Sequence, residues 1–222
     1  MPVTPRLIRA IRVRRESNQR QGYIAMDEIY KPPESDLTSG REEQAHRFFI
    51  VSRAKLAVLY LSTLGLYALY WFYINWRNFR DATGEKIMPL PRAIFYIFFT
   101  HSLFRKVDAN LKTRNIEFPW SPGLYASVFV ILAIAGNILD RLSFREIGSP
   151  FTDVASIALL PVSLLLLLKA QQAINLSLDD PEGDFNSRFT VLNYLWIALG
   201  VIFWALIALG LLEMFGVISF AD

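Results

Sequence analysis

Few side chains of this 222-residue chain could take part in metal or acid–base chemistry. The chain has no cysteine and only two histidines, His46 and His101. The lack of cysteine excludes disulfides, iron–sulfur clusters and thiolate zinc sites. Two histidines are too few for a histidine-rich metal site unless carboxylates or a second subunit complete it. We therefore expect no metal ion or other cofactor.

One histidine is spaced to work with a carboxylate. His101 and Asp108 are seven residues apart, which puts them on one face of a helix with Arg105 between them. Beside a substrate pocket, such a pair could act as acid and base on a lipid headgroup. A solvated helix face at the membrane surface explains the same pattern more simply. The chain also has no phosphate loop, zinc-protease helix or nucleophile elbow, so we predict that it is not an enzyme.

Polar and aromatic residues within long apolar segments are the second group of candidates. A polar side chain at membrane depth costs free energy, so it is a functional candidate by default. Near the ends of a segment, bonds between helices or contacts with lipid headgroups are the commoner explanation. Aromatic residues could line an apolar ligand groove, although anchoring at the membrane interface is more frequent. The candidates for contacts between helices or with partners are Tyr67, Trp71, Asn137, Gln171, Gln172, Asn175 and Glu213.

These candidates lie in a chain that is too apolar for a soluble protein. Hydrophobic residues make up 53% of the sequence, more than one soluble core of this size can hide. They are concentrated in long blocks separated by charged stretches, whereas a soluble α/β protein would distribute them over short strands. We predict an all-α, multi-pass membrane helix bundle whose first partner is the lipid bilayer.

Four apolar blocks are long enough to cross a hydrocarbon core of about 30 Å. A proline, Pro161, predicts a kink in the third of them. The segment 92–113 has too short an apolar run to cross and is predicted as an interfacial helix. The predicted membrane domain covers residues 41–222, and its spans lie near residues 56–76, 123–140, 154–174 and 194–215.

Residues 1–40 are predicted to be a basic, extended or disordered lead-in to the membrane domain. Lys31-Pro32-Pro33 cannot be helical, and the arginines that precede it surround only isolated apolar residues. Two interpretations stay open: a basic arm on anionic lipid, or a misassigned start for a protein that begins at Met26. Beside a membrane, anionic lipid is a better partner for such an arm than nucleic acid. Its arginines are Arg6, Arg9, Arg12, Arg14, Arg15 and Arg20.

The placement of the basic residues conflicts with a first block that crosses. Eleven lysines and arginines precede residue 56, and eight lie between residues 77 and 114. If block 56–76 crosses, one of these groups is outside, against the positive-inside rule. A break at Thr63-Leu64-Gly65 would instead make a hairpin that returns to the cytoplasmic side. Because such a break needs other segments to shield it from lipid, we predict four spans and keep the hairpin as the alternative.

The first block also resembles a known sequence signature. Thr63, Gly65, Tyr67, Tyr70 and Trp71 fit the pattern T-x-G-x-Y-x-x-Y-W of small bacterial multi-pass membrane proteins of unknown function. Later landmarks extend the similarity over about residues 26–215. The resemblance implies a bacterial inner-membrane protein and says nothing about an activity. Those landmarks are 92–95, Leu103-Phe104, Gln172 with Asn175, and positions within 186–204.

Three functions fit this sequence. The preferred one is a non-catalytic assembly or regulatory subunit that contacts other membrane proteins or a second copy of itself. The sequence shows no internal repeat and no charge pair within a span, which disfavours a self-contained transport pathway. The alternative is a transporter or channel protomer with an oligomeric pore lined by Asn137, Gln171, Gln172 and Glu213. The third is a lipid-headgroup enzyme that uses His101 and Asp108.

Overall fold

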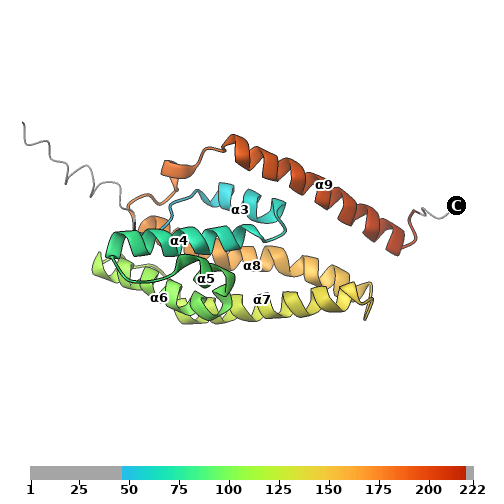
Figure 1. Cartoon of the computed structure of the whole chain (residues 1–222), viewed down its shortest axis with the longest axis horizontal. Coiled ribbons are helices and arrows are strands. Elements are labelled where there is room, and N and C mark those ends of the chain that lie inside the picture. Colours follow the sequence, from blue (N-terminus) through green and yellow to red (C-terminus); the bar gives the residue numbers. More distant parts are fainter. Residues whose placement is uncertain (1–46, 219–222) are drawn as a thin grey trace, which may run out of the picture. The chain divides into compact units, whose positions relative to one another are not determined.

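The computed structural model describes residues 47–218, and every regular element in that range is a helix (Figure 1). The lead-in predicted for residues 1–40 and the alternative start at Met26 lie outside the described residues. The all-α prediction is therefore confirmed for the described part. The elements are α3 (Arg53–Ser62), α4 (Tyr67–Thr83), α5 (Pro89–Ile94), α6 (Tyr96–Thr113), α7 (Pro122–Phe144), α8 (Phe151–Leu176), the 3-10 helix η1 (Asp184–Asn186) and α9 (Val191–Met214).

Three of the described helices, α7, α8 and α9, are long and apolar enough to cross a membrane. They lie at the second, third and fourth predicted spans, and α8 continues through Pro161. Only 6% of the most apolar stretch of α9 is buried inside the chain, so the apolar surface of this helix needs lipid or another protein to cover it. These helices indicate an integral membrane protein.

The first predicted span, near residues 56–76, is not one continuous helix. The block is broken into α3 and α4, and the backbone of Leu64 and Gly65 has positive φ angles of 52° and 87°. With 10 residues, α3 is about 15 Å long, half of what a crossing requires. Four spans are not confirmed: the described chain has three candidates and a helical hairpin, α3–turn–α4, before them.

The turn between α3 and α4 satisfies its own backbone. The Gly65 amide donates to the Tyr60 carbonyl at 2.8 Å, and the Thr63 hydroxyl accepts a hydrogen bond from the Tyr67 amide at 2.9 Å. Thr63 thereby caps the start of α4 as an N-cap side chain does. Glycine suits position 65 because its backbone is left-handed. The threonine and the glycine of the T-x-G-x-Y pattern therefore both stabilise the break between α3 and α4.

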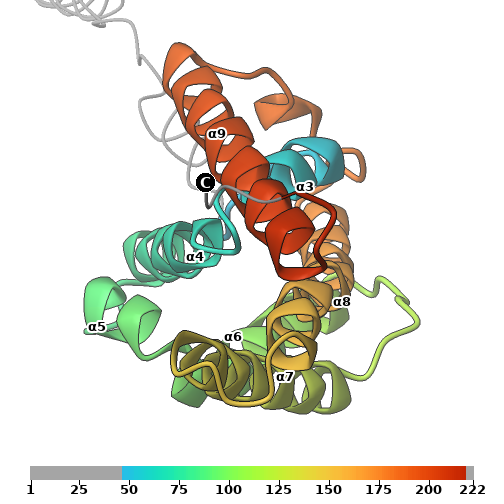
Figure 2. The same ribbon diagram turned by 90° about the vertical axis from the view of Figure 1, so that its right-hand side faces the viewer.

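Neighbouring helices cover this turn, as a hairpin at membrane depth requires. A β-carbon on Gly65 would lie 3.3 Å from the Leu160 side chain of α8. The Trp204 indole of α9 donates to the Leu61 carbonyl at 2.9 Å. Seen along the bundle, α9 crosses α3, and α3 is the only described helix against which α9 packs (Figure 2).

The predicted interfacial helix 92–113 is two helices, α5 and α6, which meet at Phe95. The buried residues Leu103, Phe104, Val107 and Leu111 recur every three or four positions on α6. This stripe packs against α7 and α8. The segment is therefore an integral part of the bundle.

The two ends of the bundle differ in charge. The turn between α7 and α8 and the last turn of α9 lie at one end, and the start of α3, the end of α4 and the loop before α9 lie at the other (Figure 1). We call the latter the basic end. Of the fifteen lysines and arginines in the described part, two, Arg141 and Arg145, adjoin the α7–α8 turn. The other thirteen belong to α3–α6 and their flanks, the last two turns of α8 or the loop before α9: Arg47, Arg53, Lys55, Arg77, Arg80, Lys86, Arg92, Arg105, Lys106, Lys112, Arg114, Lys169 and Arg188.

Candidate functional site

The segment Arg47–Ser52, which we call the extended segment, enters the bundle without regular secondary structure immediately before α3. Phe48 and Val51 are fully buried and Ile50 is 4% exposed. An extended segment has no hydrogen bonds of its own, so its buried backbone must find partners elsewhere. The candidate site consists of the side chains that supply these hydrogen-bond partners.

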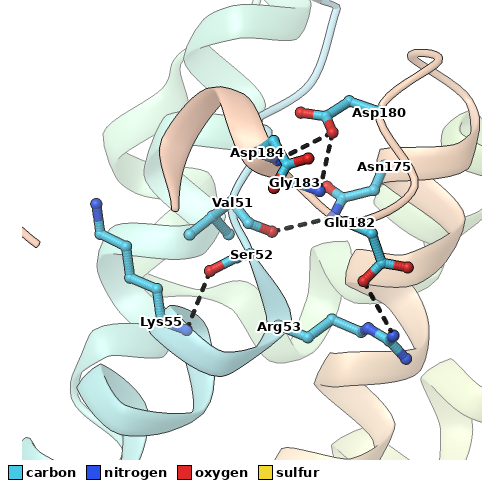
Figure 3. Close-up of polar contacts among 9 residues, drawn as sticks. All are labelled: Val51, Ser52, Arg53, Lys55, Asn175, Asp180, Glu182, Gly183 and Asp184. Atoms are coloured by element: carbon cyan, nitrogen blue, oxygen red, sulfur yellow. Dashed lines mark hydrogen bonds and ion pairs between the residues drawn. The ribbon is translucent and has the colours of Figure 1, made fainter. Parts of the chain in front are cut away.

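Four amide side chains pair with the backbone of this segment, and we call them the amide clamp. Asn75 of α4 accepts from the Phe49 amide at 3.0 Å. The other three donate to successive carbonyls. The bonds run from Gln171 to Phe49 (2.9 Å), from Asn186 to Ile50 (3.1 Å) and from Asn175 to Val51 (3.0 Å, Figure 3).

The clamp amides are oriented by further hydrogen bonds. The Trp71 indole donates to Gln171 Oε1 at 2.6 Å, and Gln171 Nε2 also donates to Asn175 Oδ1 at 2.7 Å. Asn75 Nδ2 donates to the Trp71 carbonyl at 2.8 Å. Since Gln171, Asn175 and Asn75 are fully buried, each unpaired group would cost free energy, and a fully satisfied network rigidifies the core.

A buried cation lies beside the clamp. The Lys55 side chain is 4% exposed, and its Nζ donates to Asn186 Oδ1 and to the Arg188 carbonyl, both at 2.6 Å. Within residues 47–218 no carboxylate forms an ion pair with it. Burial lowers the pKa of Lys55, because desolvation disfavours the charged ammonium.

The loop before α9 closes over the extended segment. Asp180 accepts hydrogen bonds from the amides of Gly183, Asp184 and Phe185, which folds the loop into η1 (Figure 3). Gly183 has a φ of +73°, and a β-carbon there would lie 2.5 Å from the backbone of Val51. The loop therefore touches the extended segment so closely that only glycine fits.

The predicted contact residues separate into two groups. Trp71, Gln171 and Asn175 converge on the clamp, although they come from two helices far apart in the sequence. Tyr67 lies away from them, in a groove described below. Among those outside the clamp, Asn137 donates to the Ala133 carbonyl of its own helix at 2.8 Å, Gln172 is half-buried on α8, and Glu213 is exposed near the end of α9.

Three residues of the site did not stand out in the sequence. Asn75 follows Trp71 by four positions in the aromatic block, and this spacing on one helix face was a usable signal. Asn186 and Lys55 belong to the residues that carry the family resemblance, but the resemblance implied no role for them, because an asparagine in a polar loop and a lysine before an apolar block are ordinary. Only the packing of the loop on α3 reveals their role.

Two cavities lie on either side of the hairpin turn. The first, which we call the hairpin groove, has a volume of about 600 Å³ and runs between the hairpin and α9. The second, the acidic cavity, has a volume of about 760 Å³ and lies between the turn, α7, α8 and α9. Leu64 and Leu66 line both, so the turn separates them. The acidic cavity is bordered by Asn137, Asp140, Ser143, Asp153 and Ser156.

The predicted acid–base pair is engaged elsewhere. His101 Nε2 is 3.0 Å from the Ser127 hydroxyl on α7. Asp108 accepts from the Trp120 indole at 3.1 Å and pairs with Lys112 at 2.7 Å. The two residues therefore have separate partners. Within the described range, no group of three histidine, aspartate or glutamate side chains could hold a metal ion.

The chain matches no protein-family model, and searches of curated proteins and of solved structures also found no match.

Proposed function

We propose that this chain is a non-catalytic subunit of a bacterial inner membrane, which assembles with other membrane proteins or with a second copy of itself. The observation that carries the proposal is the isolation of α9. Among the described helices it packs only on α3, and most of its large apolar side chains are exposed. A helix bundle in lipid gains from helix–helix packing, and α9 offers a long unpaired surface for it.

The polar residues support the same proposal. The buried amides of the clamp bond to one another and to the extended segment, which leaves them no free group for a substrate. His101 and Asp108 have separate partners. A site that acts on a substrate needs polar groups that converge on open space. The clamp instead stabilises the fold from which α9 projects.

The contact between α3 and α9 sets how α9 projects. The Gly200 α-carbon lies so near α3 that a β-carbon would be 2.3 Å from the Ser62 carbonyl oxygen. Trp204, one turn further on, donates to the Leu61 carbonyl. Beyond these two contacts α9 packs closely on no other described helix, and one side of its second half borders the acidic cavity. We infer that its second half is the surface for a partner helix.

The proposed topology has three crossings and a cytoplasmic basic end. The hairpin enters and leaves on the cytoplasmic side, α7 and α9 run outward and α8 runs inward. Both basic regions of the sequence then lie on the same side, as the positive-inside rule requires. The C-terminal end of α9 lies outside.

Copurification tests the proposal. The full chain is isolated from its own membranes in a mild detergent, and a stoichiometric second chain or a defined homo-oligomer is expected. Leu206→Trp in the second half of α9, where the side chain is 58% exposed, should release that partner. The matched control is Ile131→Trp on α7, where the side chain is 62% exposed. A monomer in every mild detergent, or equal release by both variants, would contradict the role of α9.

The acidic cavity favours a second candidate, an oligomeric transporter or channel. Asp140 and Asp153 border it, and Asp153 accepts hydrogen bonds from Ser143 and Ser149. Acidic side chains in a membrane cavity are typical of cation paths. Under this function, Asn137→Ala should change ion flux in reconstituted vesicles. Under the subunit function it should not.

A further inference from the structure

The hairpin groove is polar at one end and apolar along the rest of its length, which matches the two parts of an amphiphilic molecule. Its walls are apolar and aromatic and come from the hairpin and α9, with Tyr67, Tyr70, Trp196, Leu199 and Phe203 among them. Lys55, Asn186, Thr190 and Asn193 gather where α3 and α9 begin, which is the basic end. One end of the groove is thus polar and cationic, and the rest lies along a helix apolar enough to span the bilayer.

Lys55 supplies the cation at the polar end. An ammonium group has three N–H donors, and two of them go to the neutral oxygens of Asn186 and Arg188. A buried charge without a counter-ion costs free energy, and no described carboxylate pairs with this one. The third donor and the missing negative charge call for an anionic group in the groove. Arg188, whose carbonyl accepts one of these bonds, is exposed and gives the loop before α9 a positive charge of its own.

We propose that the hairpin groove binds one anionic phospholipid, with an acyl chain between the hairpin and α9 and its phosphate at Lys55. The close contact between Gly200 and Ser62 argues against a helix from another protein as the occupant. At that contact α9 and α3 touch through backbone atoms, which leaves no room between them for a helix about 10 Å wide. A single methylene chain needs far less width.

The proposal also explains the burial of Lys55. A lysine at the membrane surface usually extends toward water, whereas this one is almost fully covered and linked to the loop before α9. Burial lowers the pKa of Lys55, and a phosphate within hydrogen-bond distance acts in the opposite direction. The lipid would therefore stabilise the same contacts that join the loop to α3.

Native mass spectrometry of the full chain in mild detergent tests the proposal. The chain is titrated with phosphatidylglycerol and, separately, with phosphatidylcholine that has the same acyl chains. We expect one bound phosphatidylglycerol with a preference of about fivefold, the effect of one lysine near an anionic headgroup. Glycerol phosphate, the headgroup without chains, should not displace it. Equal binding of the two lipids, or displacement by glycerol phosphate, would overturn the proposal.

Two pairs of variants locate the lipid. Lys55→Gln should remove the preference for phosphatidylglycerol, whereas Lys86→Gln, which removes an exposed charge, should keep it. Leu199→Trp narrows the groove and should weaken the binding of both lipids about tenfold. This is the effect of excluding about two methylene groups of the acyl chain from the groove. Leu195→Trp, at a 62% exposed position of α9 outside the groove, should not. If Lys55→Gln prevents folding, the tryptophan pair alone decides, and equal effects of its two members would refute the groove as the site.

Discussion

Trp71 donates its indole N–H to Gln171 at 2.6 Å, joining α4 to α8 across a hundred positions of sequence. Gln171 then bonds to the Phe49 carbonyl and to Asn175. One glutamine thus connects the hairpin, the candidate spanning helix α8 and the buried extended segment.

Replacing Gln171 by leucine should destabilise the protein strongly. The variant leaves the Trp71 indole, the Phe49 carbonyl and the Asn175 oxygen without partners in a dry core. Each orphaned group costs roughly 1–3 kcal/mol, so we expect a loss of about 3 kcal/mol after relaxation. In detergent this corresponds to a fall in melting temperature of roughly 6–12 °C. Gln172→Leu, at the half-buried next position outside the clamp, is the control. Similar losses for both variants would show that the clamp has no special role.

Gly65 should tolerate no β-branched side chain. Its φ of +87° is a left-handed conformation, and a β-carbon would press on Leu160 at 3.3 Å. We expect Gly65→Val to cost at least about 1–2 kcal/mol from the backbone alone. Gly136→Ala, within α7 and with open space around its α-carbon, should be neutral or slightly stabilising. Thermal unfolding of both variants is the measurement, and an unchanged melting temperature for Gly65→Val would mean that the turn is not as described.

Gly200 should be the position of α9 that least tolerates a larger side chain. Gly200→Leu places side-chain atoms against the Ser62 backbone and should detach α9 from α3. Gly210→Leu, on the same helix where nothing lies within 4 Å, should leave the contact intact. Limited proteolysis of the loop before α9 reports the difference, because that loop packs on the segment preceding α3. Equal cleavage rates of the two variants would argue against the close contact.

Lys55 predicts a pH dependence with a definite sign. Burial lowers its pKa in the folded state below 10.5, so the unfolded chain binds more protons in the interval between the two values. The free energy of unfolding should therefore rise with pH across that interval. In delipidated protein, the contribution should vanish in Lys55→Met and persist in Lys86→Met. If the free energy of unfolding of wild type minus that of Lys55→Met falls with rising pH, the lowered pKa of Lys55 is contradicted.

The sequence predicted the long helices well and the hairpin poorly. For α7, α8 and α9, length and hydropathy suffice, because the membrane imposes both on any crossing helix. The first block has the same length, but the left-handed turn at Leu64 and Gly65 is stabilised by Thr63 and covered by Leu160 and Trp204. Such covering contacts come from distant positions, which a hydropathy pattern does not report.

The amide clamp was predictable only in part, again because contacts between distant positions are not visible in the sequence. Gln171 and Asn175 stood out as polar residues in an apolar helix, and Trp71 as part of the aromatic signature. The carbonyls to which Gln171 and Asn175 donate, in the segment Arg47–Ser52, did not stand out, because burial of such a segment depends on tertiary packing. Two signals in the sequence pointed to the hairpin: the conflict in the basic residues and the possible break at Thr63-Leu64-Gly65.

Thiol labelling measures the central claim, that the hairpin returns to the side from which it enters. The chain has no cysteine, so single cysteines at Thr38, before the hairpin, and at Thr83, Ser149 and Val217, after it, can be probed in intact cells with a membrane-impermeant reagent. Permeabilised cells show that each site is reactive. We predict that Thr38→Cys and Thr83→Cys are both protected and that Ser149→Cys and Val217→Cys are labelled from outside. Labelling of only one of Thr38→Cys and Thr83→Cys would mean that residues 56–76 cross the membrane, and would contradict this account.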